Sequence, residues 1–181
     1  MLVFGMGTIG LVAAIILKSM GAGVVVGADN SAKRIEKVRS LGIIDVVNTS
    51  DDDWLDQVKE MCGNKGADVI VEATGVIPVL GNAFKAVRPG GKIVVASVYS
   101  GPANDLELLP ILRKELAIVG AKGPYPHRKS DGSSASLEVL VNLQDDLRKL
   151  ITVYDYKDSF QAFDDMMSGA AIKAVIKFKN V

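Results

Sequence analysis

Short runs of apolar residues alternate along the chain with longer segments in which apolar positions recur at helical spacing. The short runs are rich in Val and Ile and mostly continuous, which is typical of parallel strands covered on both faces. The strands expected from these runs are 2–4, 24–28, 44–48, 68–72, 92–97 and 116–121. The helices expected between them are 9–20, 32–41, 54–61, 79–87 and 106–114. So many repeats of strand and helix predict an α/β fold with a doubly wound parallel sheet.

Glycine and proline stand where this order of elements needs turns. Gly21 and Gly42 follow the first two expected helices, and Pro89, Gly90 and Gly91 precede the fifth expected strand. After Ala121 the alternation stops, because the stretch 123–126 contains two prolines and breaks any regular element.

The last part of the chain predicts a different arrangement. A polar loop over 130–136 leads into an expected helix at 137–147. A second helix is expected at 159–168, with Asp158 or Ser159 as its cap and Gly169 at its end, and an apolar strand at 174–178 follows. We therefore expect one domain over residues 1–150 and a helix–strand appendage over residues 151–181.

Composition narrows the function classes. The 21 basic and 21 acidic residues balance and form no basic stripe, which argues against nucleic-acid binding. No apolar stretch has the ~18–20 residues that a membrane span requires, and no basic region precedes the first apolar run, so we expect a cytoplasmic protein. Cys62 is the single cysteine, which excludes an intramolecular disulfide and a Cys-rich metal site.

A glycine-rich loop joins the first expected strand to the first expected helix. Gly5, Gly7 and Gly10 form the pattern G-x-G-x-x-G, with Thr8 and Ile9 between the last two glycines. In this context the first glycine permits a tight turn, the second lets the backbone approach a pyrophosphate, and the third allows close packing of helix on strand. The free N–H groups at the start of the helix favour the phosphates, so we expect dinucleotide binding.

Asp29 ends the second expected strand, nineteen residues after Gly10. A carboxylate at this place can accept hydrogen bonds from the adenosine ribose and would repel a 2′-phosphate, which favours NAD over NADP. The neighbouring Lys33 and Arg34 could accommodate a phosphate, and the alternative role for Asp29 is a cap on the helix that starts at Ala32.

Several longer segments make the chain resemble the medium-chain zinc-type alcohol dehydrogenases, a family that includes polyol and threonine dehydrogenases. The segments that carry the resemblance are the glycine loop 3–10, then 33–36 with 41–42, 45–48, 66–75, 87–92, 168–169 and 173–177. The stretch 66–75, Gly-Ala-Asp-Val-Ile-Val-Glu-Ala-Thr-Gly, is the most specific of them. The resemblance implies the cofactor domain of this family, a Rossmann-type sheet with strand order 3-2-1-4-5-6.

The resemblance also implies which residues contact the cofactor. Thr74, Gly75 and Val76 would approach its adenosine and ribose side, and Ala96, Ser97 and Val98 would hold the nicotinamide carboxamide through backbone groups. Gly120 and Ala121 would flank the nicotinamide pocket. Lys173 would touch the pyrophosphate, with a solvated lysine as the equal alternative, and Arg34 would lie near adenine or be solvated. The remaining residues expected at the site are Gly5, Gly7, Thr8, Ile9, Gly10, Asp29 and Asn30.

The zinc chemistry of the family falls outside this chain. Family members carry a catalytic domain before the cofactor domain, whereas Met1 here stands directly before the first strand. One Cys and one His cannot rebuild a zinc site of the family's type, so we expect no catalytic residue and no metal ligand here. The expectation is a truncated product, an excised domain or one part of a split enzyme, inactive alone, whose parent acts on an alcohol or polyol.

The same resemblance implies how the chain would associate with a second copy. Members of the family dimerise by pairing sheet edges, and the apolar sixth strand is the expected edge. Phe160, Phe163, Met166 and Met167 lie at near-helical spacing in the segment that packs on the catalytic domain in the family.

Two alternatives remain open, and two others are argued against by the sequence. A catalytically silent NAD-binding module for sensing or assembly, or the cofactor domain of a zinc-free quinone reductase, would carry the same glycine loop. A methyltransferase would not explain segments 72–75 and 89–92. The pair Tyr125 and Lys129 has the Tyr-x-x-x-Lys spacing of short-chain dehydrogenases, but Pro126 argues against the helix this needs, and His127 is expected to be a solvated loop residue.

Overall fold

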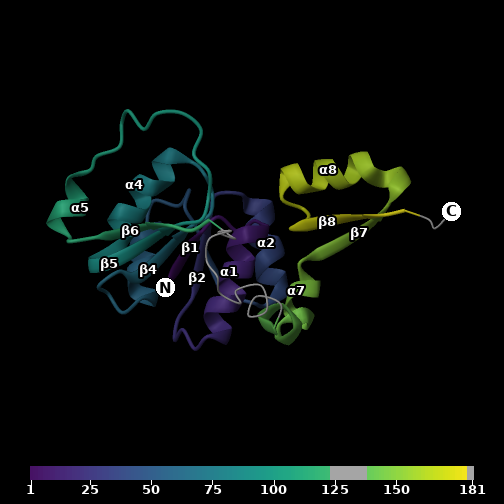
Figure 1. Cartoon of the computed structure of the whole chain (residues 1–181), viewed down its shortest axis with the longest axis horizontal. Helices are drawn as coiled ribbons and strands as arrows, with labels where there is room; N and C mark the ends of the chain where they lie inside the picture. Colours follow the sequence, from purple (N-terminus) through teal and green to yellow (C-terminus); the bar gives the residue numbers. More distant parts are fainter. Residues whose placement is uncertain (123–137, 179–181) are drawn as a thin grey trace, which may run out of the picture.

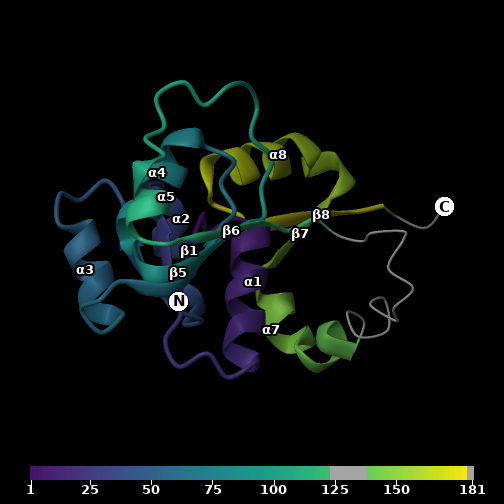
Figure 2. The same ribbon diagram turned by 60° about the vertical axis from the view of Figure 1, so that its left-hand side comes forward.

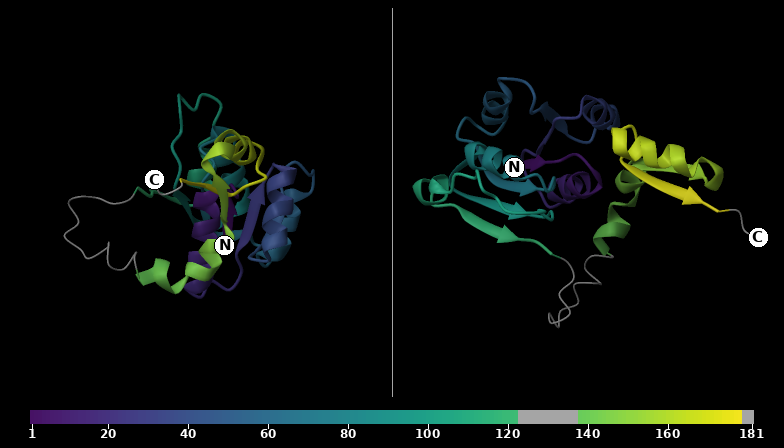
Figure 3. Two further views of the ribbon diagram at one scale, coloured as in Figure 1. Left: turned by 90° about the vertical axis from the view of Figure 1, so that its right-hand side faces the viewer. Right: turned by 90° about the horizontal axis from the view of Figure 1, so that it is seen from above.

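The computed structural model describes residues 1–122 and 138–178 of the chain. Six parallel strands form one sheet in the order β3-β2-β1-β4-β5-β6, with helices on both faces (Figures 1 and 3). The strands are β1 Leu2–Phe4, β2 Val26–Asp29, β3 Asp45–Asn48, β4 Ala67–Glu72, β5 Val87–Val95 and β6 Ala117–Gly120. The predicted Rossmann-type order is confirmed.

Five helices connect these strands. They are α1 Thr8–Ser19, α2 Ala32–Leu41, α3 Trp54–Met61, α4 Ile77–Ala86 and α5 Leu109–Arg113. The bounds predicted for α2 and α3 are confirmed, and those for α1 and α4 differ by a residue or two. The helix predicted over 106–114 is too long, because Pro110 occupies the first turn of α5 and a proline further inside a helix would clash with the preceding turn.

The core has two halves, one on each face of the sheet. Val3 belongs to the half beneath α1 and α2, whereas its neighbours Leu2 and Phe4 belong to the half beneath α3 and α4. All three side chains are inaccessible or nearly so, because successive side chains of a strand point to opposite faces and both faces are covered. This double coverage explains why the apolar runs of the sequence are continuous.

The turn predicted at Pro89, Gly90 and Gly91 is wrong, because these residues lie inside β5. Val87 pairs with Ala67 of β4, and Lys92 then pairs with Val69, so β5 contains extra residues between the two pairs. Gly90 adopts a φ of +69°, and its N–H donates to the carbonyl of Lys114 at 2.6 Å. The glycines therefore form an irregularity within a longer strand.

The C-terminal segment forms a second, two-stranded parallel sheet. Its strands are β7 Ile151–Asp155 and β8 Lys173–Lys177, and the chain between them forms η1 Tyr156–Asp158 and α8 Ser159–Ser168. The helix–strand appendage predicted for this segment is incomplete, because β7 was not expected. The residues before β7 are helical at 138–142 and at α7 Gln144–Lys149, so the described part of the helix predicted over 137–147 is interrupted at residue 143.

The second sheet lies on the side of the large sheet where α1, α2 and α7 are found (Figure 1), and Figure 2 shows it beside α1 and α7. Leu150 and Ile172, which flank it, are buried in the core half beneath α1 and α2. The segment is therefore anchored to the main body at the carboxyl ends of its central strands. No helix within residues 1–122 and 138–178 is long and apolar enough to cross a membrane.

Candidate dinucleotide-binding site

A cavity of about 280 Å³ lies at the carboxyl ends of β1, β2, β3 and β4. Its walls include many of the residues predicted for the site, namely Gly5, Gly7, Asp29, Asn30, Arg34, Thr74 and Val76. The other lining residues are Phe4, Ala28, Thr49, Ala73 and Val79. In open parallel sheets, ligands bind outside the carboxyl ends of the strands, where the strand order reverses, and β1 and β4 meet at that point here.

The three glycines of the loop differ in what surrounds them. Gly5 has a φ of +89° and would bring a Cβ within 2.9 Å of Thr74 Cγ2, so its turn and its contact with the β4 loop both require glycine. A Cβ on Gly10 would overlap the carbonyl oxygen of Gly5. Gly7 has no atom within 4 Å of an added Cβ, so the space over its backbone is open toward a ligand.

The start of α1 faces this open space. The first N–H groups of any helix have no intrahelical partner, and Gly7, the N-cap residue of α1, has no side chain that could cap them. Ile9 is exposed there, whereas the Thr8 hydroxyl donates to the carbonyl of Ile172 at 2.8 Å. Lys173 is the residue after Ile172, and its side chain is exposed. The fold thus brings an exposed lysine from the far end of the sequence to the start of α1.

Asp29 is buried and holds the glycine loop to the start of α2. One carboxylate oxygen accepts the N–H of Met6 at 2.7 Å, and the other accepts the N–H of Ser31 at 2.8 Å. Arg34 forms an ion pair with the same carboxylate at 3.3 Å. The helix-cap alternative for Asp29 is wrong, because the cap of α2 is the Ser31 hydroxyl. Arg34 is also not freely solvated, since Asp29 holds it at the cavity.

The loops after β4 and β5 meet beside the cavity. Gly75 has a φ of +72°, and a Cβ there would lie 2.7 Å from the carbonyl oxygen of Val98. Ala96 donates its N–H to the carbonyl of Glu72 at 2.8 Å, which aligns the start of the second loop with the end of β4. The strand predicted to run to Ser97 ends at Val95, and Val98 is exposed.

Glu72 is a member of this region that sequence reasoning did not assign to the site. Its carboxylate has no exposed surface and accepts hydrogen bonds from Thr74, Ser97 and Tyr99. Burial raises the pKa of Glu72, but these hydrogen bonds outweigh that effect, so the pKa lies below its ordinary value. Burial and the bond to Glu72 raise the pKa of Tyr99. An acid at the end of the strand, directly after the apolar run 69–71, was the available signal.

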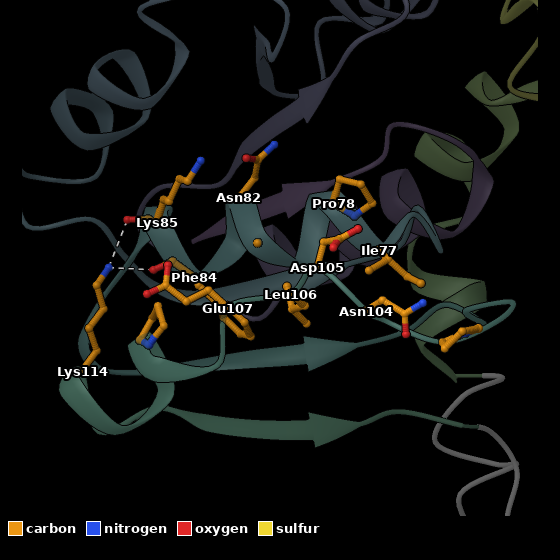
Figure 4. Close-up of a pocket in the computed structure, with 13 residues that line it drawn as sticks. Ile77, Pro78, Asn82, Phe84, Lys85, Asn104, Asp105, Leu106, Glu107 and Lys114 are labelled. Atoms are coloured by element: carbon orange, nitrogen blue, oxygen red, sulfur yellow. Dashed lines mark hydrogen bonds between the residues drawn. The ribbon is translucent and has the colours of Figure 1, made fainter.

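A larger recess of about 730 Å³ lies on another part of the molecule, between α4 and the segment leading into α5 (Figure 4). Lys114 closes one end by donating to the carbonyls of Phe84 at 2.7 Å, Lys85 at 3.1 Å and Val87 at 2.8 Å. Neither the glycine loop nor Asp29 lines this recess, so the recess is not part of the predicted site although it is larger than the cavity at Asp29.

No group of three or more His, Cys, Asp or Glu side chains in the described part of the chain is arranged to hold a metal ion. The alternatives based on Tyr125, His127 and Lys129 lie outside the described residues.

Comparisons with known proteins agree with this architecture. A family profile described as zinc-binding dehydrogenase matches residues 8–136. The chain is 28% identical to a sorbitol dehydrogenase of Halalkalibacterium halodurans, over 96% of this chain and 50% of that protein. It is 30% identical to an L-threonine 3-dehydrogenase of Deinococcus deserti, over 99% of this chain and 51% of that protein. The chain therefore spans about half the length of the curated relatives it matches.

A solved structure gives the same picture. Benzyl alcohol dehydrogenase from Acinetobacter calcoaceticus superimposes with a TM-score of 0.80 at 25% sequence identity. The match covers 98% of this chain and 49% of that protein.

Proposed function

The chain belongs to the zinc-binding dehydrogenase family, and on that basis we propose that it is the NAD-binding half of an alcohol or polyol dehydrogenase. The observation that carries the proposal is the cavity between the glycine loop and Asp29, where the backbone of Gly7 is open and a buried carboxylate lines the wall. The residues present therefore fit a dinucleotide, which would place its adenosine half in this cavity.

Each end of the cavity suits a different part of the cofactor. The free N–H groups at the start of α1 favour the pyrophosphate, with Ile9 on the exposed side and the Lys173 ammonium adding positive charge. The Asp29 carboxylate would accept hydrogen bonds from the adenosine ribose hydroxyls, and Asn30 would lie beside it. Thr74, Gly75 and Val76 would approach the adenosine and ribose side of the cofactor.

The nicotinamide half would extend past Gly75 toward β5 and β6. Backbone groups of Ala96, Ser97 and Val98 would orient the carboxamide, and Gly120 and Ala121 at the end of β6 would flank the ring. When bound, the cofactor supplies hydride transfer at the ring, whereas this chain supplies binding and orientation.

The charge arrangement at Asp29 supports a preference for NAD over NADP. A 2′-phosphate would approach the Asp29 carboxylate, which repels it. Arg34 is the nearest cation to that carboxylate, but its charge is already paired with Asp29. NADP would therefore have to break this ion pair before Arg34 could receive the phosphate.

The parts of the family's chemistry that involve zinc and alcohol are proposed to lie outside this chain. The described residues do not fit a zinc site. We place the domain boundary at residue 150, before β7. The side chains of Phe160, Phe163 and Met167 on α8 are exposed by 86%, 66% and 71%, and they would contact the remainder of the enzyme.

Self-association is proposed through β6, which is one of the two edge strands of the large sheet. Ile118 and Val119 are exposed there by 40% and 46%, and the outer backbone groups of the strand are available for pairing with a second copy.

Calorimetric titration with NAD and NADP tests this function. Wild type is expected to bind NAD more tightly than NADP, and Asp29→Ala should lose most of the NAD affinity. Asp45→Ala, an exposed acid at the opposite end of the neighbouring strand, is the matched control and should bind NAD like wild type. Equal affinity of Asp29→Ala and wild type for NAD would refute the assignment.

A further inference from the structure

Glu72 is buried without a cation beside it. Of the polar and charged side chains that the structure describes, only Asp29 and Glu72 are buried, and Glu72 has no exposed surface. Asp29 is paired with Arg34, whereas none of the ion pairs in the described residues involves Glu72. A buried carboxylate without a cation is unfavourable for folding unless hydrogen bonds compensate for the lost water.

The compensating hydrogen bonds come from two separate loops. One carboxylate oxygen of Glu72 accepts the N–H of Thr74 at 2.7 Å and the hydroxyl of the same residue. The other oxygen accepts the hydroxyls of Ser97 and Tyr99, the latter at 2.5 Å. The carboxylate therefore bridges the loop after β4 and the loop after β5.

The bridged loops touch at a second point. Gly75 and the carbonyl of Val98 approach so closely that no Cβ would fit between them. The Thr74 hydroxyl also accepts the N–H of Val76 at 3.0 Å. Because Val76 precedes the first residue of α4, Thr74 links the Glu72 carboxylate to the start of that helix. A shift of the carboxylate would thus move both loops relative to one another.

We propose that Glu72 is a positioning residue, whose carboxylate fixes the two loops at the spacing that receives the nicotinamide half of the dinucleotide. This inference rests on the proposed function. Glu72 acts through the two loops and does not contact the cofactor. The two halves of the groove are therefore held in place by different interactions. Asp29 and the glycine loop hold the adenosine half, to whose wall Thr74 and Val76 also contribute, and the nicotinamide half depends on the bridge through Glu72.

The test compares three ligands on the full chain: NAD, NADH and ADP-ribose, which lacks the nicotinamide. Tyr99→Phe removes one of the hydrogen bonds to Glu72 and leaves the ring in place, and Glu72→Gln removes the charge. Both variants should weaken NAD and NADH about tenfold, the size expected for one lost hydrogen bond to a charged group, and leave ADP-ribose affinity within about twofold.

The matched control is Asp68→Asn, the same type of change at the opposite end of β4, where the acid is exposed and paired with Arg88. It should leave all three affinities unchanged. If Glu72→Gln fails to fold, Tyr99→Phe decides the outcome, because Thr74 and Ser97 still satisfy the carboxylate.

Three results would overturn the inference while leaving the proposed function intact. ADP-ribose could weaken as much as NAD, which would make Glu72 a purely structural residue. NAD could weaken without NADH, which would show a charge effect on the oxidised ring. Both variants could bind like wild type. If wild type binds neither NAD nor ADP-ribose, the proposed function fails, and the inference fails with it.

Discussion

An alanine at Gly10 would place a methyl group on the backbone of the strand–helix turn. The added Cβ would overlap the carbonyl oxygen of Gly5 and lie 3.0 Å from its carbonyl carbon and 3.3 Å from Val3 Cγ1. Two of these three atoms belong to the backbone, so the strain cannot be relieved by rotating a side chain. The start of α1 would have to move away from β1, and the core half that contains Val3 and Leu11 would open.

The expected loss of stability in Gly10→Ala follows from the cost of overpacking a core. Such insertions cost about 1–3 kcal/mol, and a backbone overlap places Gly10→Ala near the upper end. For a chain of this size, about 3 kcal/mol corresponds to a fall in melting temperature of roughly 6–12 °C. Thermal unfolding followed by circular dichroism measures it directly.

Gly7→Ala is the companion variant, because it adds the same methyl group to open space. Gly7 has extended backbone angles that alanine also adopts, so the melting temperature should change by less than about 2 °C. NAD binding should nevertheless fall at least tenfold, since the methyl group stands where the pyrophosphate approaches the backbone. Equal melting temperatures for Gly10→Ala and wild type, or full NAD affinity in Gly7→Ala, would refute the reasoning.

Three further predictions concern stability and assembly. Because the pKa of Glu72 is lowered in the folded state, the stability that its charge contributes is fully present above the ordinary carboxyl pKa of about 4.3 and is lost as the pH falls through the lower folded value. The advantage of wild type over Glu72→Gln in urea unfolding should therefore shrink as the pH falls below about 4.3, and a pH-independent difference would count against a charged Glu72. Lys114→Met leaves three carbonyl groups without their donor and should lower the free energy of unfolding by about 1–3 kcal/mol, whereas Lys85→Met, at an exposed position, should change it little. Val119→Lys on the edge strand β6 should convert a dimer to a monomer in sizing chromatography, and a monomeric wild type would exclude this interface.

The alternation of apolar runs and amphipathic segments was sufficient to predict the large sheet. Parallel strands covered on both faces leave a continuous apolar run, and β1, β3 and β4 were found within one residue of their bounds for this reason. The missed strand β7 lacks this signal, since its residues alternate between exposed and half-buried and the strand has only one partner. Its Thr152 and Asp155 also dilute the apolar pattern.

The residues of the proposed cofactor groove could be predicted only in part for a related reason. Local motifs identified Gly5, Gly7, Gly10 and Asp29 as candidates, because the glycine spacing and the acid at the end of the next expected strand can both be read from the sequence. The contact of Thr8 with Ile172 joins residues 164 positions apart, and the bridge from Glu72 to Tyr99 spans 27 positions. Such partners are set by how the strands lie side by side, and no single stretch of sequence records them.

The most direct test of the central claim is to map which backbone amides respond to NAD in a two-dimensional NMR titration of the labelled chain. The account predicts shifts concentrated in residues 5–10, at Asn30, and in the loops at 74–76 and 96–98. The largest shifts in the recess between α4 and α5, or no shifts at saturating NAD, would contradict it.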